Sequence, residues 1–434
     1  MTYKEVLSYL DNLPAYDPEK VAMGKTVFNQ DAVNALAEGF DHPQNDVECI
    51  HIAGTNGKGS TAEFITSTLL ESGLKVGTYT SPFLIDIREE ICINGAPIPE
   101  EAFADVVSRV IIKSAEVNKK GIYPTAFEIV TASAFLYFKE EKCDIAVIET
   151  GLGGRTDATN IIKEPLVNVI TNIGLDHVGI LGGSLMKISE EKAGIIQEGS
   201  DTIIIDQDEE VIKVFKKIAK ERSGCLRIIH PDEAGIKLDD DGISFTTDFR
   251  GEKIKLKLGM KGIYQVKNAS FAAGVLSYLA DKGYNISKDD LIDGFLKVRR
   301  PVRFEILRTS PVFIADGSHN EDGVRALVES LEKNYPGRKV RFILGVLADK
   351  DFRKMFELIR PLAEKIYTIT PDNIRAMRAE YLYEILTEAG FRTEVCADVE
   401  TAIRRSSAES EEDDIICAFG SLSYMGEVRK ALMA

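Results

Sequence analysis

A short glycine-rich segment contains the residues of this 434-residue chain that most directly indicate chemistry. It follows an apolar run, Cys49–Ala53, that is typical of a buried strand, and it precedes a helix-like sequence that starts at Thr61. Glycine lets the backbone turn sharply and aim successive N–H groups at one point, and a helix N-terminus adds partial positive charge. The segment consists of Gly54, Thr55, Asn56, Gly57, Lys58, Gly59 and Ser60. Its lysine and serine complete the groups expected around the phosphates of a nucleoside triphosphate.

The spacing within this segment differs from the common phosphate-loop pattern G-x-x-x-x-G-K-[ST]. Gly59 separates Lys58 from Ser60, and the glycines stand closer together. The alternative is an ordinary tight turn between a strand and a helix, with its lysine in solvent. We favour the phosphate site, because the strand–loop–helix context that it requires is present.

Composition and charge exclude several classes of protein. A hydrophobic content of 44% and a charged content of 28% are typical of a soluble globular protein. No apolar run reaches the ~18 residues of a membrane span, and the first residues lack the layout of a signal peptide. The net charge of −16 argues against a surface that binds nucleic acid. We therefore expect a cytoplasmic protein with no nucleic-acid or membrane partner, and we take a monomer as the expected state. The six cysteines, none in a C-x-x-C pair, predict no zinc site.

Strand-like and helix-like segments alternate along the chain and predict an α/β fold with a doubly wound, mostly parallel sheet. Residues 202–262 change to short strands and predict a small β subdomain, with a turn at Asp239–Gly242. Arg299–Val302 is the best candidate linker, and the alternation restarts beyond it as a second, Rossmann-like α/β domain. We expect domains at residues 1–298 and 299–434, with a substrate site in the cleft between them.

The expected elements can be placed by residue range. In the first domain the expected strands are Cys49–Ala53, Lys75–Tyr79, Asp144–Glu149, Val167–Thr171, Thr202–Ile205, Cys225–Ile229, Gly242–Thr247 and Lys253–Leu258. The expected helices there are Asp31–Glu38, Thr61–Ser72, Glu100–Val117, Phe127–Lys139 and Gln265–Asp281. In the second domain the expected strands are Val312–Ala315, Val340–Gly345, Lys365–Thr370, Thr393–Cys396 and Ile415–Phe419. The helices expected between and after them are Glu321–Lys333, Phe352–Leu362, Ala379–Ala389, Val399–Ser407 and Leu422–Leu432.

Separated sequence blocks, taken with the glycine-rich segment, carry a family resemblance. The blocks are Thr80–Pro82, Phe127–Glu128, Glu149–Asn160, Asp176–His177, Glu191–Ile195, Arg303–Glu305, Asp316–Asn320 and Leu347–Asp351. In this order the chain resembles folylpolyglutamate synthase and dihydrofolate synthase, the folate branch of the Mur ligase superfamily, nearly end to end. The resemblance implies a Mur-ligase-type ATP-binding domain followed by a glutamate-ligase domain. It also implies a Mg²⁺-dependent enzyme that uses ATP to join L-glutamate to dihydropteroate or to the γ-carboxyl of folates, through an acyl phosphate.

The resemblance places Mg²⁺ on Ser81, Glu149 and His177. Magnesium prefers oxygen ligands, and Glu149 ends a predicted strand, at the sheet edge where ligands bind. Histidine is an unusual magnesium ligand, and His177 by itself would indicate a hydrogen-bonded structural residue.

Lys192 by itself is typical of a solvated helix end with locally paired charges. The matching lysine of the family is carbamylated by CO₂, which turns a cation into an anion able to hold a second Mg²⁺. A carbamate needs a neutral amine and hence a lowered lysine pKa, which burial or cationic neighbours provide.

The resemblance also implies contacts to the other substrates. Lys58 and Arg303 would offset the negative charge that phosphoryl transfer brings together. The implied nucleotide contacts are Asn268 at the adenine, Asp316 at the ribose and His319 at the nucleotide or the glutamate. The implied lining of the pterin pocket is Thr125, Phe127 and Asp157. Three alternatives stay open: a helix cap for Asn268, a core position for Phe127, and an ion pair with Arg155 for Asp157.

Four departures from the family pattern put the finer substrate contacts in doubt. Phe83 stands where the family usually has histidine after Ser-Pro, and Pro301-Val302 stands where it has Pro-Gly. Tyr264 replaces the histidine of the Gly-x-His-Gln motif, and the Asp-Gly-Ala-His-Asn-Pro block carries Ser318 and Glu321.

Two other functions compete with this hypothesis. A cell-wall Mur ligase usually carries an extra N-terminal domain, for which the 48 residues before Cys49 are too few. A non-catalytic nucleotide switch needs fewer metal-binding residues than the three, Glu149, His177 and Lys192, that the resemblance implies here.

Overall fold

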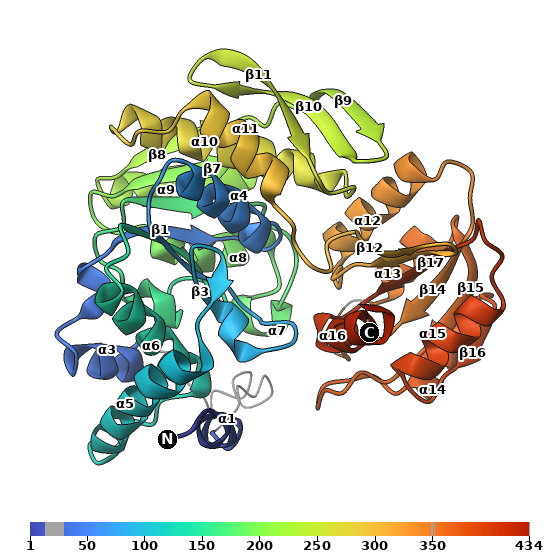
Figure 1. The fold of residues 1–434 in the computed structure, drawn as a ribbon, viewed down its shortest axis with the longest axis horizontal. Helices are drawn as coiled ribbons and strands as arrows, with labels where there is room; N and C mark the ends of the chain where they lie inside the picture. Colours follow the sequence, from blue (N-terminus) through green and yellow to red (C-terminus); the bar gives the residue numbers. More distant parts are fainter. Residues whose placement is uncertain (14–29, 349, 351, 434) are drawn as a thin grey trace. The chain divides into compact units, whose positions relative to one another are not determined.

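The computed structural model (Figure 1) describes residues 1–13, 30–348, 350 and 352–433. The chain divides into two units. Unit 1 consists of Met1–Asp232, Thr247–Ile254 and Asn268–Phe295, and unit 2 consists of Glu233–Thr246, Lys255–Lys267 and Leu296–Ala434. The domain limits expected at residues 298 and 299 stay a prediction. Asp349 and Asp351, which belong to one sequence block, lie outside the described residues.

Unit 1 contains an eight-stranded sheet in the order β4-β3-β2-β5-β1-β6-β7-β8. Its strands are β1 (Glu48–Ala53), β2 (Val76–Tyr79), β3 (Ile91–Ile93), β4 (Ala96–Pro97), β5 (Ile145–Glu149), β6 (Val167–Ile170), β7 (Asp201–Ile205) and β8 (Cys225–Ile229). Six strands are parallel, and only the short β3 and β4 pair antiparallel among the described residues. The predicted α/β class with a mostly parallel sheet is therefore confirmed.

Helices cover both faces of this sheet. They are α1 (Tyr3–Asp11), α3 (Asp31–Glu38), α4 (Lys58–Glu71), α5 (Glu100–Asn118), α6 (Ala126–Glu140), α7 (Val178–Leu181), α8 (Leu185–Lys192), α9 (Glu209–Glu221), α10 (Tyr264–Asp281) and α11 (Lys288–Lys297). Strand register places Cys49, Ala53 and Ile170 on one face, and their core clusters include apolar residues of α1, α3, α5, α6, α8 and α9. On the other face α4 packs against α11, with the rings of Phe64 and Phe295 4.8 Å apart.

A separate three-stranded antiparallel sheet has the order β11-β10-β9. Its strands are β9 (Ala234–Asp239), β10 (Gly242–Phe249) and β11 (Glu252–Leu258). The predicted turn at Asp239–Gly242 connects β9 to β10, where Asp239 and Gly242 are register partners. The expected β subdomain is present, but it does not begin at residue 202, because β7 and β8 extend the parallel eight-stranded sheet. The subdomain begins with β9, a strand that the sequence pattern did not predict.

Unit 2 contains a six-stranded sheet in the order β12-β13-β17-β14-β15-β16, with β12 antiparallel. Its strands are β12 (Glu305–Thr309), β13 (Val312–Ala315), β14 (Val340–Leu344), β15 (Ala363–Thr368), β16 (Thr393–Val395) and β17 (Ile415–Phe419). Its helices are α12 (Glu321–Asn334), α13 (Phe352–Ile359), α14 (Ala379–Glu388), α15 (Val399–Ala408) and α16 (Met425–Met433). A core cluster joins α12, α13 and α14 to the sheet.

The parallel strands of unit 1 determine where a site can form. The carboxyl ends of β1, β2, β5 and β6 meet at one edge of the sheet, which is where open α/β sheets bind ligands. These strands lead into Gly54, Thr80, Thr150 and Thr171, so the predicted site residues gather at this edge. None of the described helices is long and apolar enough to cross a membrane.

Candidate active site

The predicted phosphate loop connects β1 to α4 and is held from two sides. The helix begins at Lys58, three residues before the expected start, so the lysine lies in its first turn. Thr55 N–H donates to Asn172 O over 2.8 Å, which ties the loop to the segment after β6. Gly57 has a φ of 90°, a conformation that residues with a side chain rarely adopt. A Cβ there would lie 2.6 Å from Asn268 Oδ1, so glycine also makes room for this asparagine.

Asn268 is the fifth residue of α10, which begins at Tyr264. The alternative role of Asn268 as a helix cap is therefore wrong. Its side chain lies against the phosphate loop instead, which is compatible with the implied nucleotide contact.

Lys58 and Glu149 face each other across the loop. Lys58 Nζ lies 3.7 Å from Glu149 Oε1, so the alternative of a lysine in solvent is wrong. Glu149 ends β5 and is 4% exposed, and its Oε2 has no hydrogen-bond partner among the described residues. Burying a charged oxygen without a partner is unfavourable, and a bound cation supplies the missing interaction. Glu149 therefore fits the role of a magnesium ligand.

Lys192 ends α8 and is buried against the phosphate loop. Its side chain is 4% exposed, and Nζ donates to Gly54 O over 2.6 Å. Burial, and then the charge of Lys58, lowers the pKa of Lys192 to about 7. The alternative of a solvated helix end with paired charges is wrong, because the neighbouring Glu191 pairs with Arg155.

Two glycines bring α8 close to the loop that follows β5. A Cβ at Gly154 would lie 2.9 Å from Lys192 O, and one at Gly194 would lie 2.3 Å from Arg155 Cα. Arg155 N–H donates to Glu191 O over 2.8 Å. This backbone contact fixes the position of Lys192 relative to the segment that begins at Glu149.

Asp157 organises the same loop. Its carboxylate accepts from Leu152 N (2.8 Å), Thr159 N (3.0 Å) and Thr159 Oγ1 (2.6 Å). Burial raises the pKa of Asp157. The alternative ion pair with Arg155 is wrong, because that guanidinium pairs with Glu191. The implied pterin contact of Asp157 stays a prediction.

His51, inside β1, supports this arrangement and was not singled out in the sequence. Its Nε2 lies 2.8 Å from Thr159 Oγ1. Thr159 donates its proton to Asp157, so His51 Nε2 is the donor in this bond. Burial lowers the pKa of His51 to about 3, which keeps the ring neutral. A histidine within an apolar run was the available sequence signal.

Glu90 is a second residue that sequence reasoning missed. It is buried beside the segment that carries Ser81, where its Oε1 accepts from Phe83 N over 3.3 Å and its carbonyl accepts from Thr80 N over 3.2 Å. Burial, and then the charge of Glu149, raises the pKa of Glu90 to about 8. The Glu89-Glu90 pair resembles an exposed charged turn in sequence, so no local signal marked it.

The three implied magnesium ligands come from three segments at the carboxyl edge. Ser81 follows β2, Glu149 ends β5, and His177 precedes α7 with a left-handed φ of 49°. Such a conformation in a non-glycine residue is often found at functional sites. The described residues contain no cluster of three or more histidine, cysteine or acidic side chains suited to a metal, so the set, which includes a serine, stays a prediction.

Two of the implied pterin residues have structural partners. Thr125 caps α6, since its Oγ1 accepts from Glu128 N over 3.3 Å. The ring of Phe127 leaves no space at Gly151, where a Cβ would lie 2.5 Å from Phe127 Cζ. Phe127 thus lies beside the loop that follows Glu149, and both of its proposed roles stay open.

In unit 2, Asp316 follows β13 and is 1% exposed. Its Oδ2 accepts from Tyr264 OH (2.7 Å) and Phe304 N (2.8 Å), and its Oδ1 accepts from Ser318 N (2.8 Å) and the Ser318 hydroxyl. A carboxylate can accept about four hydrogen bonds, and these four donors of the chain already fill those positions. The nearby His319 donates from Nδ1 to Gly317 O over 2.8 Å, because a carbonyl oxygen can only accept. The implied ribose contact of Asp316 stays a prediction.

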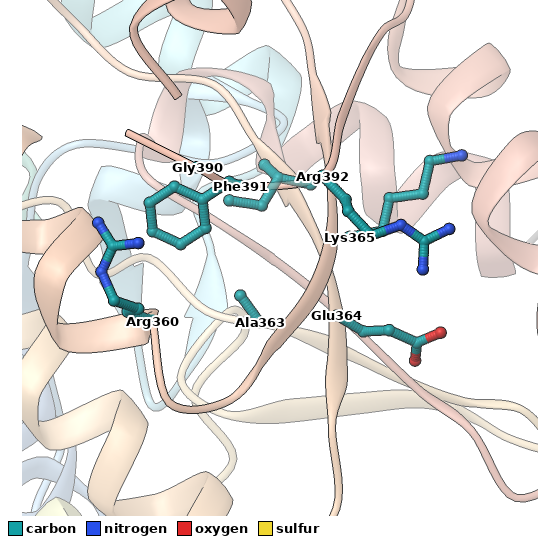
Figure 2. A pocket seen from close by; sticks show the side chains of 8 residues that line it. Arg360, Ala363, Glu364, Lys365, Gly390, Phe391 and Arg392 are labelled. Atoms are coloured by element: carbon teal, nitrogen blue, oxygen red, sulfur yellow. The ribbon is translucent and has the colours of Figure 1, made fainter. Parts of the chain in front are cut away.

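A cavity of about 180 Å³ lies elsewhere in unit 2, at the amino ends of β15 and β16 (Figure 2). Arg360, stacked on Phe391 at 4.3 Å, pairs with Glu357, and Lys365 pairs with Glu394. Asp316 lies at the opposite, carboxyl edge of the sheet. We therefore assign this cavity no part in the reaction.

Known proteins are similar to both units. The chain matches the Mur ligase middle domain over residues 52–276 and the Mur ligase glutamate ligase domain over residues 302–422. It is 33% identical over 401 residues to the dihydrofolate synthase/folylpolyglutamate synthase of Bacillus subtilis, covering 90% of this chain and 92% of that protein.

Solved structures are similar along the whole chain, and two of them serve as examples. One is the Mycobacterium tuberculosis folylpolyglutamate synthase complexed with ADP and AMPPCP, with a TM-score of 0.88, 26% identity and coverage of 100% of this chain and 98% of that chain. The other is E. coli FolC in complex with DHPP and ADP, with a TM-score of 0.84, 26% identity and the same coverage.

Replacing Lys192 with methionine tests its lowered pKa. Between about pH 7 and 10.5 the unfolded lysine binds a proton that the folded lysine lacks, so Lys192 makes the protein more stable as the pH rises. We expect the unfolding free energy of the wild type, minus that of Lys192→Met, to rise by up to about 1.4 kcal/mol per pH unit in this window. Urea unfolding at pH 7 and 9 in bicarbonate-free buffer measures it, with Lys187→Met on the same helix as control. A difference independent of pH would contradict the assignment.

Gly194→Ala tests the close approach of α8 to the loop after β5. The added Cβ would overlap Arg155, and overpacking of this kind costs about 1–3 kcal/mol. Gly183→Ala is the matched control, because no described atom lies within 4 Å of its Cβ. Urea unfolding should show a clear loss of stability for the first variant only, and equal stabilities would argue against the contact.

Proposed function

The chain belongs to the folylpolyglutamate synthase and dihydrofolate synthase branch of the Mur ligases, and from this premise we propose its reaction in detail. The protein is an ATP-dependent ligase that joins L-glutamate to the carboxyl group of dihydropteroate, to the γ-carboxyl of a folate, or to both. The observation that carries this proposal is the arrangement of Lys58, Glu149 and Lys192 around the phosphate loop.

Phosphoryl transfer to a carboxylate brings negative groups together, and the residues of unit 1 supply what this step needs. The loop N–H groups and the N-terminus of α4 attract the phosphates, and Lys58 adds a full positive charge. Ser81, Glu149 and His177 would hold Mg²⁺, which when bound neutralises phosphate charge. The partnerless Glu149 oxygen supports a cation at this position.

We assign the remaining contacts as part of the same proposal. Asn268 contacts the adenine, which its place against the phosphate loop supports. Unit 2 contributes Arg303 to phosphoryl transfer, Asp316 to the ribose and His319 to the nucleotide or the glutamate. The pterin pocket includes Thr125, Phe127 and Asp157.

We further propose that Lys192 is carbamylated and holds a second Mg²⁺. In this step the neutral amine forms an N–C bond to CO₂ and releases a proton, which leaves an anionic carbamate. A lysine pKa of about 7 supports the proposal, because it makes the neutral amine abundant near neutral pH.

Labelled bicarbonate tests the carbamate directly. We expect a carbamate carbon signal in the ¹³C NMR spectrum of the protein with ¹³C-bicarbonate, ADP and Mg²⁺, absent from Lys192→Met. A mass spectrum is unsuitable because the adduct is labile. A bare ammonium at Lys192 in a nucleotide-bound crystal grown with bicarbonate would count against the proposal.

A product assay tests the reaction itself. With ATP, Mg²⁺ and L-glutamate, the protein is offered dihydropteroate and tetrahydrofolate in parallel, and we expect ADP and a glutamylated product from at least one. Glu149→Gln removes the charge of the proposed ligand and should lower kcat about 100-fold or more. Glu364→Gln is the control, since Glu364 pairs with Arg341 in unit 2. ATP hydrolysis that depends on neither glutamate nor a pterin substrate would instead support a nucleotide switch.

A further inference from the structure

Arg303 lies between two residues with a strained backbone. Val302 and Phe304 have φ values of 50° and 52°, in the left-handed region. This conformation costs about 1–2 kcal/mol for a residue with a side chain, and for β-branched valine it is a clear outlier. Both side chains are buried, at 3% and 2% exposure. Burial of a large apolar side chain stabilises by about 1.5–3 kcal/mol, so packing offsets the strain on both sides of the arginine.

Two carboxylates hold this segment through its backbone. Val302 N–H donates to Glu305 Oε2 over 2.9 Å, and Phe304 N–H donates to Asp316 Oδ2 over 2.8 Å. Arg303 Nη1 donates to Val302 O over 3.1 Å, which folds the side chain back over its own segment. The backbone on each side of Arg303 is therefore held by a charge-assisted hydrogen bond.

Gly317 lies directly against the guanidinium of Arg303. Its N–H donates to Val302 O over 2.8 Å. A Cβ at this position would lie 2.1 Å from Arg303 Nη1, so a side chain here would displace the guanidinium. The arginine thus lies directly on the segment that follows Asp316.

Glu305 is itself held from α16. Arg429 Nε donates to its two oxygens over 3.2 and 3.0 Å, and Arg429 Nη2 donates to Oε1 over 3.1 Å. Bidentate pairs of this kind are among the stronger charge-assisted interactions and fix direction as well as distance. Arg429 therefore orients the carboxylate while its Oε2 holds Val302.

We propose that Glu305, oriented by Arg429, is a positioning residue that keeps Val302 and Phe304 in the left-handed conformation that presents the guanidinium of Arg303 between them. The inference rests on the proposed role of Arg303 in phosphoryl transfer and adds the groups that pre-organise it. A cation that is already in place stabilises developing charge without reorganisation. A segment released from Glu305 would relax away from its strained conformation and misplace the charge.

Glu305→Gln tests the proposal, because it keeps the side-chain shape and removes the charge. Hydrogen exchange followed by mass spectrometry should show the peptide spanning 302–317 exchanging about 10-fold faster or more, with the rest of the unit 2 sheet unchanged. Turnover should fall about 10- to 100-fold, with a smaller change in the KM for ATP. Arg429→Lys, which keeps a charge but loses the bidentate pair, should give a smaller effect of the same kind.

A double-mutant cycle with Arg303→Ala separates positioning from general stability. We expect Arg303→Ala to lower kcat strongly and the kcat effect of Glu305→Gln to vanish in its presence. Glu364→Gln, which removes another arginine-paired carboxylate of unit 2, should change neither kcat nor exchange at 302–317.

Two results would overturn the proposal. One is a lower Tm for Glu305→Gln with unchanged exchange at 302–317 and unchanged kcat, which would make the ion pair merely structural. The other is an equal loss of kcat with and without Arg303. Near-normal turnover of Arg303→Ala would refute the proposed role of the arginine itself, and exchange at 302–317 would then still decide whether Glu305 holds the segment.

Discussion

The buried hydrogen bond from Lys192 Nζ to Gly54 O is the contact on which the site of unit 1 depends. It places an amine directly under the phosphate loop, near Lys58 and three carboxylates that affect its pKa. Burial opposes a charge on Lys192, and so does the neighbouring lysine. The result is an amine that loses its proton near neutral pH. It lies beside the residues that are proposed to bind a nucleotide and a cation. The same low polarity that lowers this pKa strengthens every charged interaction nearby.

This contact requires backbone segments to approach each other without side chains between them. Gly154 and Gly194 allow the loop after β5 to lie against the end of α8. Asp157 then ties the loop together, and the neutral His51 supports it through Thr159. The chain therefore uses hydrogen bonds among buried polar groups to shape the loop, and it leaves one oxygen of Glu149 for a ligand.

Unit 2 positions a charged side chain in a different way. Its arginine is presented by a strained backbone, held by Glu305 and Asp316 and by the buried side chains of Val302 and Phe304. The family usually has glycine at the position of Val302, and the left-handed φ explains this, because glycine adopts it without strain. Here valine takes the same conformation, and its packing compensates. Tyr264, another of the four departures, donates to Asp316 and so helps to hold the same segment.

Local patterns of residues were sufficient to predict several elements of the fold. The apolar runs of β13 and β17 predicted these strands with their observed bounds, and the glycine-rich segment predicted a strand–loop–helix phosphate site. Among the elements that the sequence pattern did not predict, β12 is a half-exposed edge strand, and α9 carries Val211, Ile212 and Phe215 at helical spacing. The family resemblance supplied the site residues, since no local pattern distinguishes Glu149 or His177 from other polar residues after a strand.

The surroundings of each side chain depend on how distant segments pack in the folded chain. Lys192 stands in a run of charged residues that indicates a solvated helix end. It is buried nevertheless, because Gly154 and Gly194, which are 40 residues apart in sequence, let their two backbone segments meet. The burial of Glu90 and the left-handed backbone around Arg303 follow in the same way from contacts between separate segments. Burial and charge proximity set the pKa and orientation of a side chain, and both are properties of the folded arrangement that no local stretch of sequence contains.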